Sequence, residues 1–145
     1  MEMPLSIASH ACLMLLAPYT RHPRFGLSTQ VVTKLQRLSG FDGIIMPGLG
    51  DRMNTTEQEV KENLDICLAP WSDIKQSLPV PGGSDWAGSL LRMYKTFGTK
   101  DFSMVPGRGV FGHPMGPEGG ARSIRQAWEA IDRGASIAYK ANSLP

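Results

Sequence analysis

The sequence has few cysteines, few aromatic residues and almost no excess of charge. Its two cysteines, Cys12 and Cys67, are too few and too far apart in 145 residues for a zinc site. In apolar surroundings such a pair more often stays as free thiols than forms a disulfide, which favours a reducing, cytoplasmic compartment. The net charge is only +2 and the basic residues are scattered, so we expect no nucleic-acid partner.

Long hydrophobic runs are also missing. The apolar stretch IASHACLMLLAPY is interrupted by Ser9 and His10 and has no basic residues before it. It is too short to cross a bilayer, so we expect neither a signal peptide nor a membrane partner. We interpret it as a buried strand that leads into a loop. The hydrophobic content of 41% and charged content of 19% are typical of one soluble domain with its own core.

Glycine and proline are frequent, with 16 and 11 residues, and they recur in a pattern. A short apolar run, a glycine- and proline-rich loop and an amphipathic helix follow one another four times. The predicted strands are residues 4–10, 42–46, 77–81 and 102–106. Their near-continuous apolar character indicates parallel pairing, buried on both faces. The loops before each helix lie on the side where α/β proteins bind ligands.

The four predicted helices carry clear start signals and one-sided apolar positions. Ser28 is expected to cap the first helix, which Gly40 ends, and Thr55 or Thr56 to cap the second. The third covers residues 86–97 and the fourth residues 118–133. The apolar positions are Val31, Val32, Leu35 and Leu38 in the first helix, Val60, Leu64, Cys67 and Leu68 in the second, and Leu90, Leu91, Met93 and Tyr94 in the third.

Four strand–helix units correspond to half of a (β/α)8 barrel, which typically needs about 250 residues. An open four-unit sheet is the alternative. The glycines of GRGVFG (107–112) do not have the spacing of a dinucleotide fingerprint relative to the helix that follows. A glycine cluster of this kind indicates that backbone comes close to another group.

Three segments together carry a family resemblance: FDGIIMPGLGDRM (41–53), LPVPGGSD (78–85) and GRGVFGHPMGPEGGARSIRQAWEA (107–130). In this order they resemble the C-terminal half of the RuBisCO large-subunit superfamily, above all the RuBisCO-like (form IV) proteins. The similarity covers most of residues 4–135. It implies an α/β fold, with strands five to eight of a (β/α)8 TIM barrel forming a single partial domain over residues 1–145.

The resemblance implies a phosphate site in the loops after the last two strands. Gly107, Arg108 and Gly109 would form one wall, and Gly83 with Ser84 the other. Clustered backbone N–H groups without obstructing side chains suit a dianion. The residues alone leave open the alternative that these glycines serve only turn geometry.

Two further residues are catalytic candidates by resemblance. His10 resembles a histidine that faces the active site from the end of strand five, although a hydrogen-bonded core histidine is the alternative. Arg52 is nearest to the place of a loop lysine in carboxylases, although a solvated loop arginine is the alternative. We expect His113 to tie down its own loop by hydrogen bonds, and His22 to be solvated.

Three departures from the family pattern argue against carboxylation. Ala11, Ile45 and Gly82 stand where carboxylating members have the arginine, histidine and serine that hold a second phosphate. The opposite end of the pocket therefore becomes apolar and offers a dianion no donor. The resemblance then implies an enolase or isomerase that acts on a sugar monophosphate of the methylthioribulose-phosphate type. A true ribulose-bisphosphate carboxylase is less favoured.

The family binds Mg²⁺ through a carbamylated lysine and two carboxylates on strand two, which this chain does not include. The acidic residues here are dispersed, so we expect no metal ligand in the chain. They are Asp42, Asp51, Asp85 and Asp101. One hypothesis is a fragment whose missing N-terminal half supplies metal and base, in a homodimer or larger assembly. The alternatives are a non-catalytic, truncated phosphate-binding half barrel that pairs with a second copy, and an unrelated open α/β binding module.

Overall fold

The computed structural model describes residues 10–12, 17–20, 22, 24–50, 53–83 and 85–134. Its sheet has the strand order β1-β2-β3, and both pairings are parallel, as predicted. The register places Ile45 beside Cys12 on one side and Val80 on the other. Residues 4–9 of the first predicted strand lie outside the described residues. The strands are β1 (His10–Cys12), β2 (Gly43–Pro47) and β3 (Leu78–Gly82).

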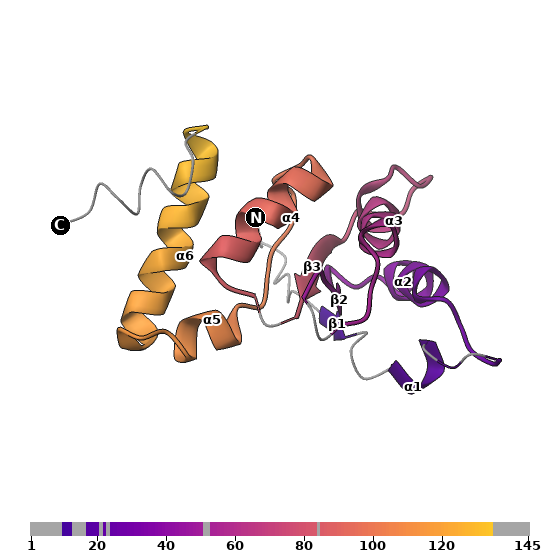
Figure 1. Ribbon diagram of the computed structural model, residues 1–145. Coiled ribbons are helices and arrows are strands. Elements are labelled where there is room, and N and C mark those ends of the chain that lie inside the picture. Colours follow the sequence, from indigo (N-terminus) through magenta and orange to yellow (C-terminus); the bar gives the residue numbers. More distant parts are fainter. Residues whose placement is uncertain are drawn as a thin grey trace, which may run out of the picture.

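The described helices flank this sheet in chain order (Figure 1). They are α1 (Ala17–Thr20), α2 (Thr29–Leu38), α3 (Glu57–Leu68), α4 (Ala87–Phe97), α5 (Gly107–Phe111) and α6 (Gly116–Asp132). Ser28 caps α2 by accepting from the N–H of Val31 at 3.3 Å. Thr56 caps α3 by accepting from the N–H of Glu59 at 3.1 Å. Gly40 follows α2 with a φ of +84°, so these predicted helix boundaries are confirmed.

Two hydrophobic cores hold the elements together. In the first, Ile44 and Met46 of β2 pack with Val32 of α2 and Cys67 of α3. The second joins α3, α4 and α6 and includes Phe102, which follows α4. Its buried members are Val60, Leu64, Leu90, Met93, Phe97, Phe102, Ala127 and Ile131. No helix in the described part of the chain is both long and apolar enough to cross a membrane.

The fourth predicted strand is wrong, because residues 102–106 are not a strand. The N–H of Ser103 donates to the carbonyl of Pro79 at 3.0 Å, so the segment does run beside β3. However, Pro79 and Pro81 are the β3 residues whose backbone faces this edge, and proline has no N–H. The edge offers acceptors without donors, so a parallel ladder cannot be completed there.

The predicted apolar positions of α2 do lie on one side of the helix, but of these four residues only Val32 is buried. Val31, Leu35 and Leu38 are 42%, 53% and 51% exposed. The buried face instead consists of Val32 with three polar residues, which are Thr29, Thr33 and Arg37. The helix can bury its polar side instead, because hydrogen-bonding partners on α3 and after it satisfy these polar side chains.

Candidate functional site

The loops that follow β2 and β3 and the start of α5 pack against one another through glycine backbone. A Cβ atom at Gly50 would overlap the carbonyl oxygen of Gly83. A Cβ atom at Gly109 would lie 2.5 Å from the carbonyl oxygen of Asp85 and 2.7 Å from the Cα atom of Trp86. Both approaches require glycine, because any side chain would push the backbones apart. The packing places the two predicted walls, Gly83 and Gly109, on either side of Asp85.

Asp85 forms hydrogen bonds with both predicted walls, through Gly109 and through Gly83. Its main-chain carbonyl accepts from the N–H of Gly109 at 3.2 Å, and its carboxylate accepts from the N–H of Gly83. Oδ1 also accepts from the Ser89 hydroxyl, at 3.3 Å. The side chain is 1% exposed, and Oδ2 has no hydrogen-bond partner among the described residues. Burial raises the pKa of Asp85 to about 6, against the smaller lowering effect of the Ser89 and Gly83 hydrogen bonds.

Gly107 differs from the other glycines of this region. A Cβ atom there would meet no described atom within 4 Å, and its φ is not positive. Neither packing nor backbone strain therefore demands glycine at this position. The N–H groups of Gly107 and Arg108, the first two residues of α5, donate to no described residue. Among the described residues, these two backbone donors have no partner and face open space.

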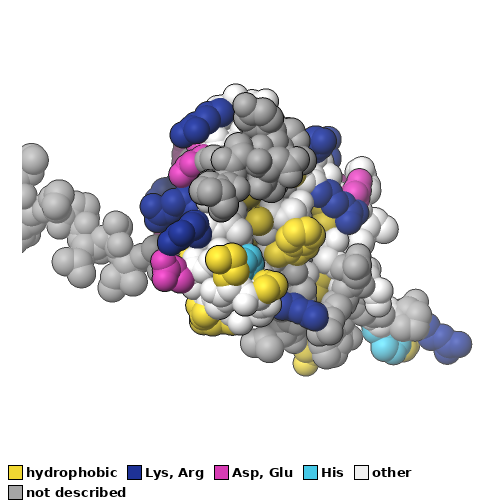
Figure 2. Space-filling view, turned by 60° about the vertical axis from the view of Figure 1, so that its left-hand side comes forward, with side chains coloured by type: hydrophobic (Ala, Val, Ile, Leu, Met, Phe, Trp, Pro, Cys, Tyr) yellow, Lys and Arg dark blue, Asp and Glu magenta, His cyan; other side chains and the backbone are white. Residues whose placement is uncertain are grey.

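Arg108 and Gly109 line a small pocket together with Trp86 and His113. Its volume is about 260 Å³, and Gly112 and Pro114 complete the lining. Trp86 is 61% exposed, and Phe111 and Met115 are 77% and 80% exposed. Figure 2 shows hydrophobic side chains gathered around a histidine on one face of the molecule. The predicted phosphate wall therefore adjoins an apolar surface.

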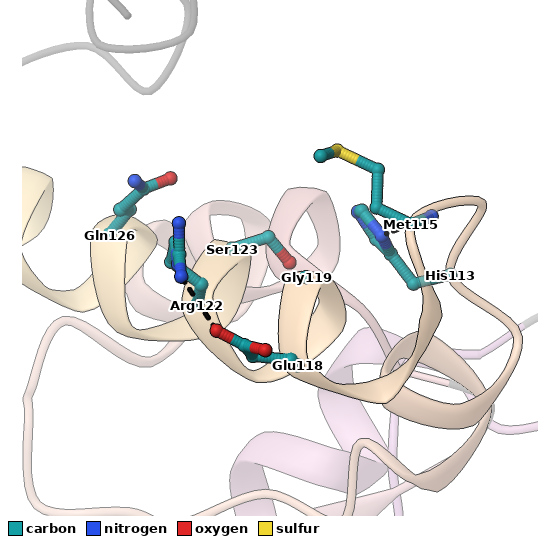
Figure 3. A pocket seen from close by; sticks show the side chains of 7 residues that line it. All are labelled: His113, Met115, Glu118, Gly119, Arg122, Ser123 and Gln126. Atoms are coloured by element: carbon teal, nitrogen blue, oxygen red, sulfur yellow. Dashed lines mark hydrogen bonds and ion pairs between the residues drawn. The ribbon is translucent and has the colours of Figure 1, made fainter.

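A larger hollow of about 560 Å³ lies along the first turns of α6 (Figure 3). Its cation, Arg122, is paired with Glu118 at 2.7 Å. His113 accepts from the N–H of Met115 at 3.2 Å through Nδ1, which confirms the prediction that this histidine ties down its loop. Of the predicted site residues, none that the structure describes lines this hollow.

The remaining candidates are placed only in part. The backbone of His10 pairs in register with Gly43, the first residue of β2, whereas the His10 side chain is not among the described parts of the structure. Arg52 and Ser84 lie outside the described residues altogether. His22 is exposed, as expected, and accepts from the N–H groups of Arg24 and Phe25 at 3.2 and 3.0 Å. The roles of His10, Arg52 and Ser84 stay predictions.

No group of three histidine, cysteine, aspartate or glutamate residues in the described ranges could hold a metal ion. The family in general uses Mg²⁺, and the described residues do not fit a site for it. Asp85 is the site residue that sequence reasoning missed, because an aspartate before a helix is typical of an ordinary cap. Its position directly after GGS in LPVPGGSD was the available signal.

Comparisons with known proteins agree with the resemblance. The model of the family described as ribulose bisphosphate carboxylase large chain, catalytic domain, matches residues 5–145. A ribulose bisphosphate carboxylase-like protein of Allochromatium vinosum is 59% identical over 130 residues, which are 90% of this chain and 28% of the relative.

Solved structures of this family have the same arrangement of strands and helices. Octameric ribulose-1,5-bisphosphate carboxylase/oxygenase from Pyrococcus horikoshii matches with a TM-score of 0.87 and 34% identity, over 94% of this chain and 33% of that one. A rubisco-like protein (MtnW) from Alicyclobacillus acidocaldarius matches with a TM-score of 0.83 and 26% identity, over 94% of this chain and 34% of that one. The chain thus spans about a third of the length of these proteins.

Proposed function

Because the chain belongs to the ribulose bisphosphate carboxylase large-chain family, we propose that it supplies the phosphate-binding loops of a RuBisCO-like enzyme. In this proposal the complete enzyme enolises or isomerises a sugar monophosphate in the cytoplasm. The chain forms one partial domain of that enzyme, corresponding to the C-terminal barrel half.

The observation that carries the proposal is the open space at Gly107. Glycine there is demanded neither by neighbouring atoms nor by φ, whereas a ligand that approaches the backbone would demand it. The N–H groups of Gly107 and Arg108, which have no partner among the described residues, can donate to phosphate oxygens. Gly83 and Gly109, one from each wall implied by the family resemblance, are both hydrogen-bonded to Asp85, which supports a single site between the walls.

The residues away from the glycine loops are consistent with a ligand that carries only one phosphate. Ile45 takes the place of the family histidine, and its neighbours in register are Cys12 and Val80. No cationic side chain occurs at this level of β2 and β3, so a second dianion would be desolvated without compensation. A ligand with an apolar tail, such as a methylthioribulose phosphate, suits these residues better than a sugar bisphosphate.

We assign the metal and the base to the part of the family's length that this chain does not span. His10 and Arg52 would line the pocket of the complete enzyme. The second candidate is a phosphate-binding half barrel without catalysis, and it is favoured by the lack of a metal-ligand group among the described residues. Phosphate binding by this chain is common to both.

Replacing Gly107 by valine tests the proposal. The side chain would fill the open space, so we expect binding of a sugar monophosphate to fall below detection while the fold is kept. Calorimetric titration with and without Mg²⁺ measures the binding, and urea unfolding measures the stability. Ala121→Val, at an exposed position of α6, is the matched control and should bind as the original chain does. Unchanged binding by the folded Gly107→Val variant would overturn the assignment.

A further inference from the structure

Asp85 is hydrogen-bonded to the two glycine walls that flank the proposed anion site, whose own donors are the N–H groups of Gly107 and Arg108. Its carboxylate takes the N–H of Gly83 and its carbonyl takes the N–H of Gly109. Any anion that approaches these two glycines therefore arrives beside a second negative charge. Like charges that lie close together in a buried site repel one another, because little water is there to screen them.

The described residues around Asp85 provide no cation to offset that repulsion. Arg108 on α5 is exposed and His113 after it is half-buried, and neither contributes to the pKa of Asp85. Asp51 and Arg52 follow Gly50 in sequence and lie outside the described residues. On its own helix, the group that faces the carboxylate is the neutral Ser89. The carboxylate is 1% exposed, so water screens it little.

Protonation of the carboxylate would remove the conflict. A neutral carboxyl group no longer repels the anion. Oδ2, which has no partner among the described residues, is the oxygen left to carry that proton. Burial already brings the pKa of Asp85 to about 6, close to neutrality before any anion is present. An anion beside it raises the pKa further.

We propose that anion binding between these loops is coupled to the uptake of one proton from solvent, and that Asp85 is the residue that takes it. The inference rests on the proposed phosphate binding and adds a specificity-determining residue to it. The proton is bound to a carboxyl oxygen, and no other bond changes. The site then holds a phosphate dianion at neutral pH without a basic side chain, and the affinity falls as the pH rises.

Sulfate is the probe, because it stays a dianion across the range in which Asp85 titrates. Calorimetric titration at about pH 7, in buffers of different ionisation enthalpy, gives the number of protons taken up per sulfate. We expect a value close to one for the unmodified chain. Because of this linkage, the sulfate affinity should fall about tenfold per pH unit above the pKa of the free carboxyl group.

Asp85→Asn should bind sulfate without proton uptake, with an affinity independent of pH and about tenfold higher at pH 7. Asp65→Asn removes the same charge from an exposed position of α3 and should keep the uptake. Both variants retain the three histidines, His10, His22 and His113. Uptake that persists in Asp85→Asn would therefore belong to a histidine and would overturn the inference.

A measurement on the unmodified chain covers the case in which Asp85→Asn does not fold. Carbon-13 NMR of the Asp85 carboxyl group should show its pKa rising by at least one unit when sulfate is added. An unchanged pKa would overturn the inference. The amide signals of Gly83 and Gly109, recorded in the same samples, show whether sulfate binds at this place.

The outcomes separate the two proposals. If sulfate binds at these amides without proton uptake, the inference about Asp85 fails and phosphate binding stands. If the folded chain binds neither sulfate nor a sugar monophosphate at any pH, both fail.

Discussion

Arg37 is a buried cation whose charge is stabilised by hydrogen bonds to backbone carbonyl oxygens. It is 1% exposed and donates to the carbonyls of Lys75 at 3.1 Å, Ile74 at 3.3 Å and Ile66. Its guanidinium also lies 5.6 Å from the ring centroid of Trp71. Ile66 is in the last turn of α3, where unpaired carbonyls favour a positive charge. Arginine spreads its donors over three nitrogens, so Arg37 reaches three carbonyls that lie apart, whereas the donors of lysine share one nitrogen.

Cys67 is the second residue whose chemistry follows from burial. It is fully buried, and burial raises the pKa of its thiol to about 12, although Arg37 acts in the opposite direction. Since the thiolate is the reactive form, we expect no modification of Cys67 by a thiol reagent at pH 8 in the folded protein. The measurement is a disulfide-exchange assay on a Cys12→Ser variant, with and without concentrated urea. Fast reaction of the folded variant would contradict this burial.

At the scale of elements, α2 and α3 are joined by a polar seam as well as by the first core. Asn63 on α3 accepts from the hydroxyl of Thr33 at 2.7 Å and donates to the hydroxyl of Thr29 at 2.9 Å. Thr29 in turn donates to Glu59 at 2.8 Å. All three of Asn63, Thr29 and Thr33 are buried. Each supplies a partner that another needs, so the seam fixes how the two helices pack.

Replacing Asn63 by leucine tests the seam. The side chain is of similar size but cannot form hydrogen bonds, so Thr29 and Thr33 would each lose a partner in the interior. We expect the free energy of unfolding to fall by about 2 kcal/mol, measured by urea unfolding. Lys61→Leu, at an exposed position of the same helix, should change it by less than about 0.5 kcal/mol. Equal effects of the two substitutions would show that the seam adds no stability.

The elements that could be predicted from sequence are those whose signals are local. Ser28 and Thr56 cap the helices that follow them, and the apolar run ending at Met46 forms a strand. Residues 102–106 look like a strand by the same criteria. Whether they pair depends on Pro79 and Pro81 of the neighbouring strand, which a window of local sequence does not contain.

Of the candidate site, the glycine walls could be predicted from the sequence but the role of Asp85 could not. Gly83 and Gly109 were placed on two walls by resemblance, and the structure brings both against Asp85. The importance of Asp85 itself comes from burial and from bonds to residues far apart in sequence. The position of Asp85 after GGS was a signal for its place in the loop, but the sequence does not show its burial or its bonds.

At the scale of the whole molecule, the described elements form an open row rather than a closed barrel, with α2 and α6 near opposite ends (Figure 1). The outer side of α2 is apolar. Leu27, Val31, Leu35 and Leu38 are between 42% and 53% exposed, and their spacing of three and four residues puts them on one stripe. Contiguous exposed apolar side chains of this kind mark surfaces that another element covers.

We therefore predict that the chain associates through this stripe, either with a second copy or with the rest of a longer protein. In a solution of this chain alone, sedimentation equilibrium should detect a dimer, and Leu35→Lys should weaken the dimer at least tenfold. A lysine in an apolar contact must lose its hydration without a partner, whereas in the monomer the position faces water and tolerates it. The free energy of unfolding of the monomer should accordingly change by less than about 0.5 kcal/mol.

The matched control is Met115→Lys, which places the same charge on an apolar side chain that is 80% exposed, in the loop before α6. If the dimer forms through α2, this variant stays dimeric while Leu35→Lys becomes monomeric. The reverse result would move the contact to the surface around α5, which adjoins the proposed phosphate site. In that case dimer formation and sulfate binding should affect each other, because both involve residues from Trp86 to Met115. With the contact at α2 they should be independent, since α2 and the start of α6 lie at different ends of the row.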